Sequence, residues 1–260
     1  MDLKKVKRAG VAAAYEGGKV LREHFGTDLK VAKKGPIDLV TEADTGSEAA
    51  IVAAILKVFP DHTILAEEGG LTKGDTSNKW IIDPLDGTTN FAHRLAFFSV
   101  SIAFSRNDEI VIGIVLNPIS GELFTAVAGE GATLNGVPIE VSNVAILTES
   151  LLVTGFPYNA GKNFQPLMRR FENCLLATQG VRRLGSAALD LCHVACGRFE
   201  GFWEQNLNPW DTAAGMLIAR EAGGIVTDFG NRPFSPDQKE ILATNGKIHK
   251  KMLGLLEDSA

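Results

Sequence analysis

Residues 80–91, with the sequence WIIDPLDGTTNF, combine two acidic side chains with a turn that can expose backbone amides. The apolar run 80–82 predicts a strand that ends at Asp83, and Pro84 then prevents regular strand pairing. Asp86 follows, and the Gly-Thr-Thr sequence at 87–89 is typical of the start of a short helix, whose free N–H groups can hold a phosphate. This segment therefore places possible metal ligands beside a possible phosphate site.

Two further acidic positions have a similar setting. Glu67 leaves a short predicted strand just before two glycines, and Asp211 lies in the first turn of a predicted helix. If these two residues converge with Asp83 and Asp86, each pair at ~4 Å would repel by about 4 kcal/mol at an effective dielectric constant of ~20. A cluster of this kind requires cations, and oxygen ligands without histidine or cysteine favour Mg²⁺ or Mn²⁺. Convergence would indicate a multi-metal phosphatase, although each acid alone is equally well explained as a turn or capping residue.

The elements that must position these acids follow from hydrophobic periodicity. Apolar residues at helical spacing predict a helix over 3–24 and a second over 41–59, which Pro60 ends. Asp44 lies near the first turn of the second helix. The pattern is then mostly that of strands, which an antiparallel meander explains most simply, at 63–66, 80–82, 98–105, 110–116 and 122–126.

The second half of the chain has a different pattern. A strand over 151–154 is followed by short strands that alternate with predicted helices over 163–177, 186–196 and 209–222. This alternation indicates an α/β lobe. We therefore expect an N-terminal α+β lobe over 1–150 and a C-terminal α/β lobe over 151–260, which together form one compact functional unit with the active site between them.

Composition narrows the class of protein. The 260 residues are 45% hydrophobic and 22% charged, as in a globular protein, and no stretch approaches the ~18 apolar residues of a membrane span. The net charge of −5 and the short basic pairs argue against direct nucleic-acid binding. Three cysteines without a CxxC pair indicate neither a disulfide framework nor a zinc site. We expect a cytoplasmic protein.

Three segments together resemble one known family. WIIDPLDGTTNFAH, with AEEGG upstream and NPWDTAAG downstream, is similar to the signature motifs of the inositol monophosphatase family, and the similarity extends over essentially the whole chain. The resemblance implies a layered αβαβα sandwich of the inositol monophosphatase and fructose-1,6-bisphosphatase type. It also implies a homodimer, lithium sensitivity, and two or three Mg²⁺ ions per active site, which Mn²⁺ can replace.

The resemblance also implies roles for individual residues. Glu67, Asp83 and the carbonyl of Leu85 would bind the first metal, whereas Asp83, Asp86 and Asp211 would bind the second. A third, weaker Mg²⁺ would lie near Glu67. Thr88, supported by Asp44, would position and help to deprotonate the attacking water, in a direct displacement without a phosphoenzyme. Lys33 would lie on a loop near the metals. The residues implied to contact the substrate are Asp86, Gly87, Thr88, Gly185, Ser186, Ala187, Glu204 and Asp211.

The physiological substrate is the open question. The resemblance favours hydrolysis of inositol 1-phosphate, but relatives hydrolyse fructose 1,6-bisphosphate, 3'-phosphoadenosine 5'-phosphate or histidinol phosphate, and 155–158 (GFPY) differs from animal enzymes. An alternative of another class is a partner in transcription antitermination with dispensable catalysis. DPLDGT also resembles the haloacid-dehalogenase signature DxDGT, but Asp83 and Asp86 are three residues apart rather than two.

Overall fold

The computed structural model describes residues 2–27, 31–33, 39–157, 161 and 164–257, and it describes the side chains of these residues except 31–33 and 39–40. Two long helices form the first layer. Helix α1 spans Leu3–His24 and starts at Asp2, whose carboxylate accepts hydrogen bonds from the N–H groups of Lys4 and Lys5. Helix α2 spans Glu42–Leu56 and begins with a capping box. Both predicted helices are confirmed, and α2 ends three residues before the predicted end at 59.

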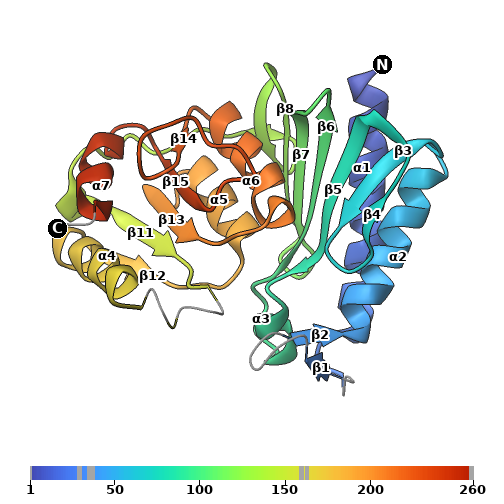
Figure 1. Ribbon diagram of the computed structural model, residues 1–260, viewed down its shortest axis with the longest axis horizontal. Coiled ribbons are helices and arrows are strands. Elements are labelled where there is room, and N and C mark those ends of the chain that lie inside the picture. The colour runs from blue at the N-terminus through green and yellow to red at the C-terminus, as the bar shows by residue number, and fades with distance from the viewer. Residues whose placement is uncertain (1, 28–30, 34–38, 158–160, 162–163, 258–260) are drawn as a thin grey trace.

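An eight-stranded sheet forms the second layer, and α1 and α2 pack against one of its faces (Figure 1). The strand order is β10-β9-β8-β7-β6-β5-β3-β4. The predicted meander is confirmed from β5 to β8, where neighbours are antiparallel, but β3 pairs with β5 in parallel. The strands are β3 His62–Ala66, β4 Gly70–Thr72, β5 Asp75–Asp86, β6 Ser99–Arg106, β7 Glu109–Asn117, β8 Glu122–Val127, β9 Gly131–Leu134 and β10 Val137–Pro138.

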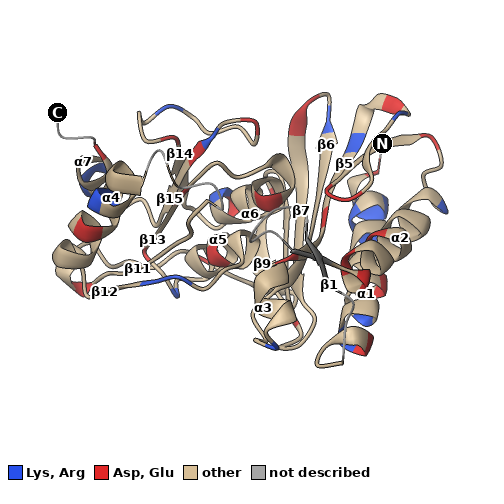
Figure 2. Cartoon of the chain, turned by 60° about the horizontal axis from the view of Figure 1, so that its bottom comes forward, with Lys and Arg blue, Asp and Glu red and all other residues tan. Residues whose placement is uncertain are grey.

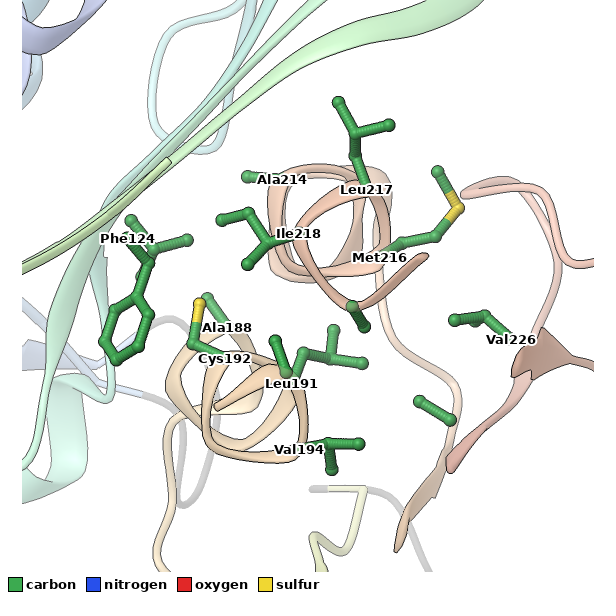
Figure 3. Packing of buried hydrophobic residues seen from close by; sticks show 14 of the residues in the cluster. Phe124, Ala188, Leu191, Cys192, Val194, Ala214, Met216, Leu217, Ile218 and Val226 are labelled. Atoms are coloured by element: carbon green, nitrogen blue, oxygen red, sulfur yellow. The ribbon is translucent and has the colours of Figure 1, made fainter. Parts of the chain in front are cut away.

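Two buried helices form the middle layer. Helices α5, Ala187–Ala195, and α6, Pro209–Glu221, share a hydrophobic core with the inner face of the large sheet, for example with Phe124 (Figure 3). A Cβ atom on Gly113 of β7 would lie 2.5 Å from the carbonyl oxygen of Ala214. Glycine therefore allows α6 to approach the sheet backbone closely.

A five-stranded mixed sheet and two outer helices complete the fold (Figure 1). The order is β12-β11-β13-β15-β14, with strands at Leu151–Thr154 (β11), Gly180–Arg182 (β12), Gly201–Gln205 (β13), Ile225–Thr227 (β14) and Glu240–Thr244 (β15). Helices α4, Phe164–Ala177, and α7, His249–Leu256, pack on its outer face. The layers therefore alternate as αβαβα, as predicted. Because α5 and α6 contact both sheets, the boundary near residue 150 stays a prediction.

Short elements connect these layers. Strand β1, Val31–Lys33, pairs antiparallel with β2, Leu39–Thr41. Strand β2 contacts the short helix α3, Thr88–Ala92, and a 3₁₀ turn covers Leu147–Glu149. Within the described residues, no helix is both long and apolar enough to cross a membrane. Basic and acidic residues are interspersed along the chain (Figure 2).

Candidate active site

The loop from Asp83 to Asp86 departs from the sheet as Pro84 predicts. The register between β5 and β6 shifts between Asp83 and Asp86, so the strand bulges there. The N–H of Leu85 donates to the Asp83 carboxylate at 2.9 Å, and the Ser47 hydroxyl of α2 donates to the Pro84 carbonyl at 2.9 Å. These bonds fix a buried loop that aims its carboxylates toward the second half of the chain.

Asp86 connects the large sheet to the start of α5. One carboxylate oxygen accepts hydrogen bonds from the Ser186 hydroxyl at 2.5 Å and from the N–H of Ala188 at 2.8 Å. Gly87 has a positive φ of 102°, and a Cβ there would lie 3.1 Å from the Gly185 carbonyl oxygen. The turns that precede α3 and α5 therefore lie close together.

Thr88 begins α3 and is tied to α2. Its hydroxyl lies 3.1 Å from a carboxylate oxygen of Asp44 and 3.1 Å from the carbonyl oxygen of Leu85, and can donate its one proton to either. The other Asp44 oxygen accepts from the N–H and the hydroxyl of Thr41, at 2.7 and 2.6 Å. Asp44 is therefore held rigidly, and it can orient the Thr88 hydroxyl.

The remaining predicted acids come from three other elements. Glu67 directly follows β3, and its N–H donates to the carbonyl of Ile82 at 3.1 Å. Asp211 lies in the first turn of α6, where the N–H of Asn208 donates to its carboxylate at 2.6 Å. Glu204 lies on β13, opposite Gly155: a Cβ atom on Gly155 would lie 2.2 Å from each carboxylate oxygen of Glu204.

These elements enclose a single pocket of about 580 Å³. Asp44 is buried behind Thr88, and the side chain of Lys33 lies outside the described residues. The pocket brings together every other residue that the sequence indicated: Glu67, Asp83, Leu85, Asp86, Gly87, Thr88, Gly185, Ser186, Ala187, Glu204 and Asp211.

The acids of this pocket have raised pKa values. Burial raises the pKa of Asp83 well above its ordinary value, and the charges of Glu67, Asp86 and Asp211 raise it further. Burial also raises the pKa of Asp86 to about 6, although Ser186 and Ala188 oppose the change, and it raises those of Asp211 and Glu204 to about 8. Mutual repulsion in a buried site is the condition that bound cations relieve.

The donor chemistry fits a hard divalent cation. The pocket offers carboxylate oxygens and the Leu85 carbonyl, and neither histidine nor cysteine is among its lining residues. Over the described part of the chain, no three acidic, histidine or cysteine side chains already lie close enough to hold one ion. The carboxylates of this pocket and the Leu85 carbonyl are the groups that would hold such an ion.

Several residues in or beside the pocket were given no role from the sequence. Asn90 of α3 donates to the Phe97 and Leu184 carbonyls, both at 2.7 Å, and so anchors the turn before α5. Arg183 and Asp190 line the pocket, and one Asp190 oxygen is buried without a hydrogen-bond partner. Gly155 leaves room for Glu204. Asn90 and Gly155 lie within segments quoted above, where neither was given a role, but no local signal identified Arg183 or Asp190.

Comparison with known proteins places the chain in one family. The family model "Inositol monophosphatase family" matches residues 2–260. The chain is 47% identical over 253 residues to "Inositol-1-monophosphatase" of Synechocystis sp., covering 96% of this chain and 88% of the relative. It is 42% identical to "Nus factor SuhB" of Pasteurella multocida, over 95% of this chain and 94% of that one.

A solved structure supports the fold in the same way. The crystal structure of the extragenic suppressor protein suhB from Bartonella henselae superposes with a TM-score of 0.95 at 40% identity, covering 98% of this chain and all of that one. The family model spans the chain from its second residue, and the pocket unites both of the motifs that suggested the resemblance. The chain therefore belongs to the inositol monophosphatase family, and it is a phosphatase.

Proposed function

We propose that the protein hydrolyses inositol 1-phosphate to myo-inositol and phosphate with the help of Mg²⁺. One observation carries this proposal: the acids Glu67, Asp83, Asp86 and Asp211 line one pocket with Thr88, whose hydroxyl is within hydrogen-bonding distance of Asp44. Bound Mg²⁺ would offset the negative charge of the phosphate and lower the pKa of a water molecule, so that hydroxide is available to attack the phosphate near neutral pH.

The residues of the chain would orient the water, bind the phosphate and hold the metal. Thr88, oriented by Asp44, would accept a hydrogen bond from the attacking water and so place it in line with the phosphorus atom. The N–H groups at 87–89, at the left-handed turn before α3, would bind phosphate oxygens. Asp83 and Asp86 would act as ligands from the loop whose shape Pro84 fixes.

The inositol ring would lie toward the second half of the chain. Glu204 and the start of α5, residues 185–187, would contact its hydroxyl groups, because they belong to the second half of the chain and line the same pocket as Glu67 and Asp83. A buried acid selects a polyol, since a substrate without the hydroxyl group leaves the carboxylate without a partner. Fructose 1,6-bisphosphate and other sugar or nucleotide phosphates are the competing substrates.

The decisive experiment measures phosphate release from inositol 1-phosphate, fructose 1,6-bisphosphate, 3'-phosphoadenosine 5'-phosphate and histidinol phosphate, each with Mg²⁺ and with EDTA. We expect metal-dependent turnover, fastest with inositol 1-phosphate. The matched variant Asp83→Asn should retain the fold and lose most turnover. Near wild-type activity of this variant at saturating Mg²⁺ would contradict the assignment.

The relatives named Nus factor SuhB favour a second candidate function in transcription. In that case the chain would bind a transcription complex without needing its catalytic acids. Pull-down of transcription partners with wild-type protein and with Asp86→Asn separates the two functions. Retained partner binding together with lost phosphate release would support both roles in one chain.

Other expectations extend this proposal. Mg²⁺ as the physiological ion, two or three ions per site, lithium inhibition, a homodimer and a cytoplasmic location all rest on the family resemblance. Inhibition of phosphate release by lithium tests the expected lithium sensitivity, and the mass of the protein in solution tests the homodimer. If the protein is a monomer and still hydrolyses the substrate, the homodimer is wrong and the proposed reaction chemistry is unaffected.

A further inference from the structure

One face of α2 contacts three separate segments of the active site. Asp44, Ser47 and Glu48 occupy positions i, i+3 and i+4, so their side chains lie on the same side of the helix. Asp44 reaches Thr88, and Ser47 donates to the Pro84 carbonyl at 2.9 Å. Glu48 accepts a hydrogen bond from the N–H of Glu68 at 2.9 Å.

Glu48 contacts the turn that carries the proposed metal ligand Glu67. Glu68 directly follows Glu67, and both residues lie in the turn between β3 and β4. Glu48 is only 9% exposed, so its carboxylate holds this turn from the buried side. Ser47 is fully buried and holds the loop at 83–86 from the neighbouring position of the same helix.

The contacts of Glu48 and Ser47 together fix the distance between the turn that carries Glu67 and the loop that carries Asp83. A helix is rigid over two successive residues, so the turn that carries Glu67 and the loop that carries Asp83 are tied to one fixed support. Glu67 and Asp83 are also close enough for the charge of Glu67 to raise the pKa of Asp83. The pair is therefore held in place despite its repulsion.

Gly69 fits this arrangement. A Cβ atom on Gly69 would lie 2.7 Å from a carboxylate oxygen of Glu48, although the residue itself is exposed. A real Cβ cannot remain that close, so alanine at this position must displace either the turn or the Glu48 carboxylate. The contact can thus be disturbed from the surface of the protein.

We propose that Glu48 is a positioning residue for metal binding: it holds the turn after β3 so that Glu67 faces Asp83, with Ser47 holding the opposite loop. The inference rests on the proposed function, because it assigns Glu48 to the support of the same metal site. Residues that support metal ligands typically change metal affinity by about 10–100-fold when they are removed.

The test is a titration of the purified, metal-free protein with Mg²⁺ alone, followed by calorimetry, together with the Mg²⁺ concentration that gives half-maximal phosphate release. We expect Glu48→Ala to weaken Mg²⁺ binding about 10–100-fold, and Glu48→Gln, which keeps an acceptor oxygen, to restore most of the affinity. Glu42→Ala, an exposed change on the same helix, should bind Mg²⁺ like the wild type.

Gly69→Ala gives an independent measurement because it leaves the buried core unchanged. It should also weaken Mg²⁺ binding, by about tenfold, and in the Glu48→Ala background it should have almost no further effect, since the clash is gone. If Glu48→Ala does not fold, Gly69→Ala against Glu42→Ala carries the test.

The outcomes separate the two levels of the proposal. Wild-type Mg²⁺ affinity in folded Glu48→Ala or Gly69→Ala overturns the positioning role and leaves the proposed function standing. Fully additive effects in the double variant overturn it as well. Absence of Mg²⁺ binding by the wild type overturns the proposed function and, with it, this inference.

Discussion

Replacing Asp86 by asparagine should have opposite effects on stability with and without metal. In the metal-free fold the pKa of Asp86 is about 6, against an ordinary value of 3.8, mainly because the side chain is buried. Each pKa unit corresponds to about 1.4 kcal/mol, so ionised Asp86 destabilises the folded state by about 3 kcal/mol above pH 6. This cost shrinks as the pH falls and disappears below 3.8, because the folded state keeps its proton to higher pH than the unfolded state.

Asparagine removes the charge and keeps the contacts. Its amide oxygen can still accept the hydrogen bonds from Ser186 and Ala188. After allowance for imperfect replacement, we expect Asp86→Asn to raise the free energy of unfolding by about 2 kcal/mol at pH 8 in EDTA, which corresponds to about 5 °C in Tm. At pH 5 the gain should fall by roughly half.

Mg²⁺ should make the wild type more stable than Asp86→Asn. An ion at 100 times its Kd stabilises the folded state by about 2.7 kcal/mol, and Asp86→Asn removes a proposed ligand and most of this gain. Thermal unfolding in EDTA and in saturating Mg²⁺ measures both effects. As a control, Glu122→Gln should lower the Tm equally in both conditions, because a hydrogen bond from Arg198 lowers the pKa of Glu122. The reasoning is refuted if the Tm of Asp86→Asn is below that of the wild type in EDTA, or still above it in saturating Mg²⁺.

Three further predictions concern catalysis, specificity and acid stability. Thr88→Val should lower kcat by about 10²–10⁴ with little change in Mg²⁺ affinity, as stopped-time phosphate assays and calorimetry would show; unchanged kcat removes Thr88 from the mechanism. Gly155→Ala, whose Cβ would lie 2.2 Å from both Glu204 oxygens, should raise KM for inositol 1-phosphate at least about tenfold while sparing p-nitrophenyl phosphate, which has no hydroxyl group. Equal losses on both substrates would argue against a contact between Glu204 and the substrate. Burial and the charge of Arg198 lower the pKa of His193 to about 4. The unfolded state therefore takes up this proton at higher pH than the folded state. As the pH falls from 6.5 to 4, the free energy of unfolding should decrease by up to about 3 kcal/mol. His193→Gln should show a weaker loss of Tm over that interval, and identical pH profiles would contradict this account.

Periodicity and turn chemistry predicted much of the fold. The helix over 3–24 and the strands up to 126 follow from alternation of apolar residues, and Pro84 correctly indicated that regular pairing fails after Asp83. The parallel pairing of β3 with β5 was not predicted, because strand direction depends on how the chain crosses over and not on local pattern. The pair of strands β1 and β2 was missed because each has only three residues.

The site was predictable where several functional residues lie in one motif. Asp83, Asp86 and Thr88 fall within six residues of the chain and are all found in the pocket. Glu48 and Asp190 were not found, since one buried acid in an apolar helix gives no local sign of what it contacts. Such residues become visible only when the fold shows that Glu48 reaches the N–H of Glu68, twenty residues away.

The hydrogen bonds that join Asp86 to the start of α5 also constrain when the site can form during synthesis. Ser186 lies 100 residues beyond Asp86 in the chain, and the ribosome needs about ten seconds to add that many residues at ~10 per second. During this interval the carboxylates of the first half have neither the α5 amide nor Asp211 beside them. The acidic loop of the nascent chain therefore waits for its partners, and the pocket closes only after α6 has been made.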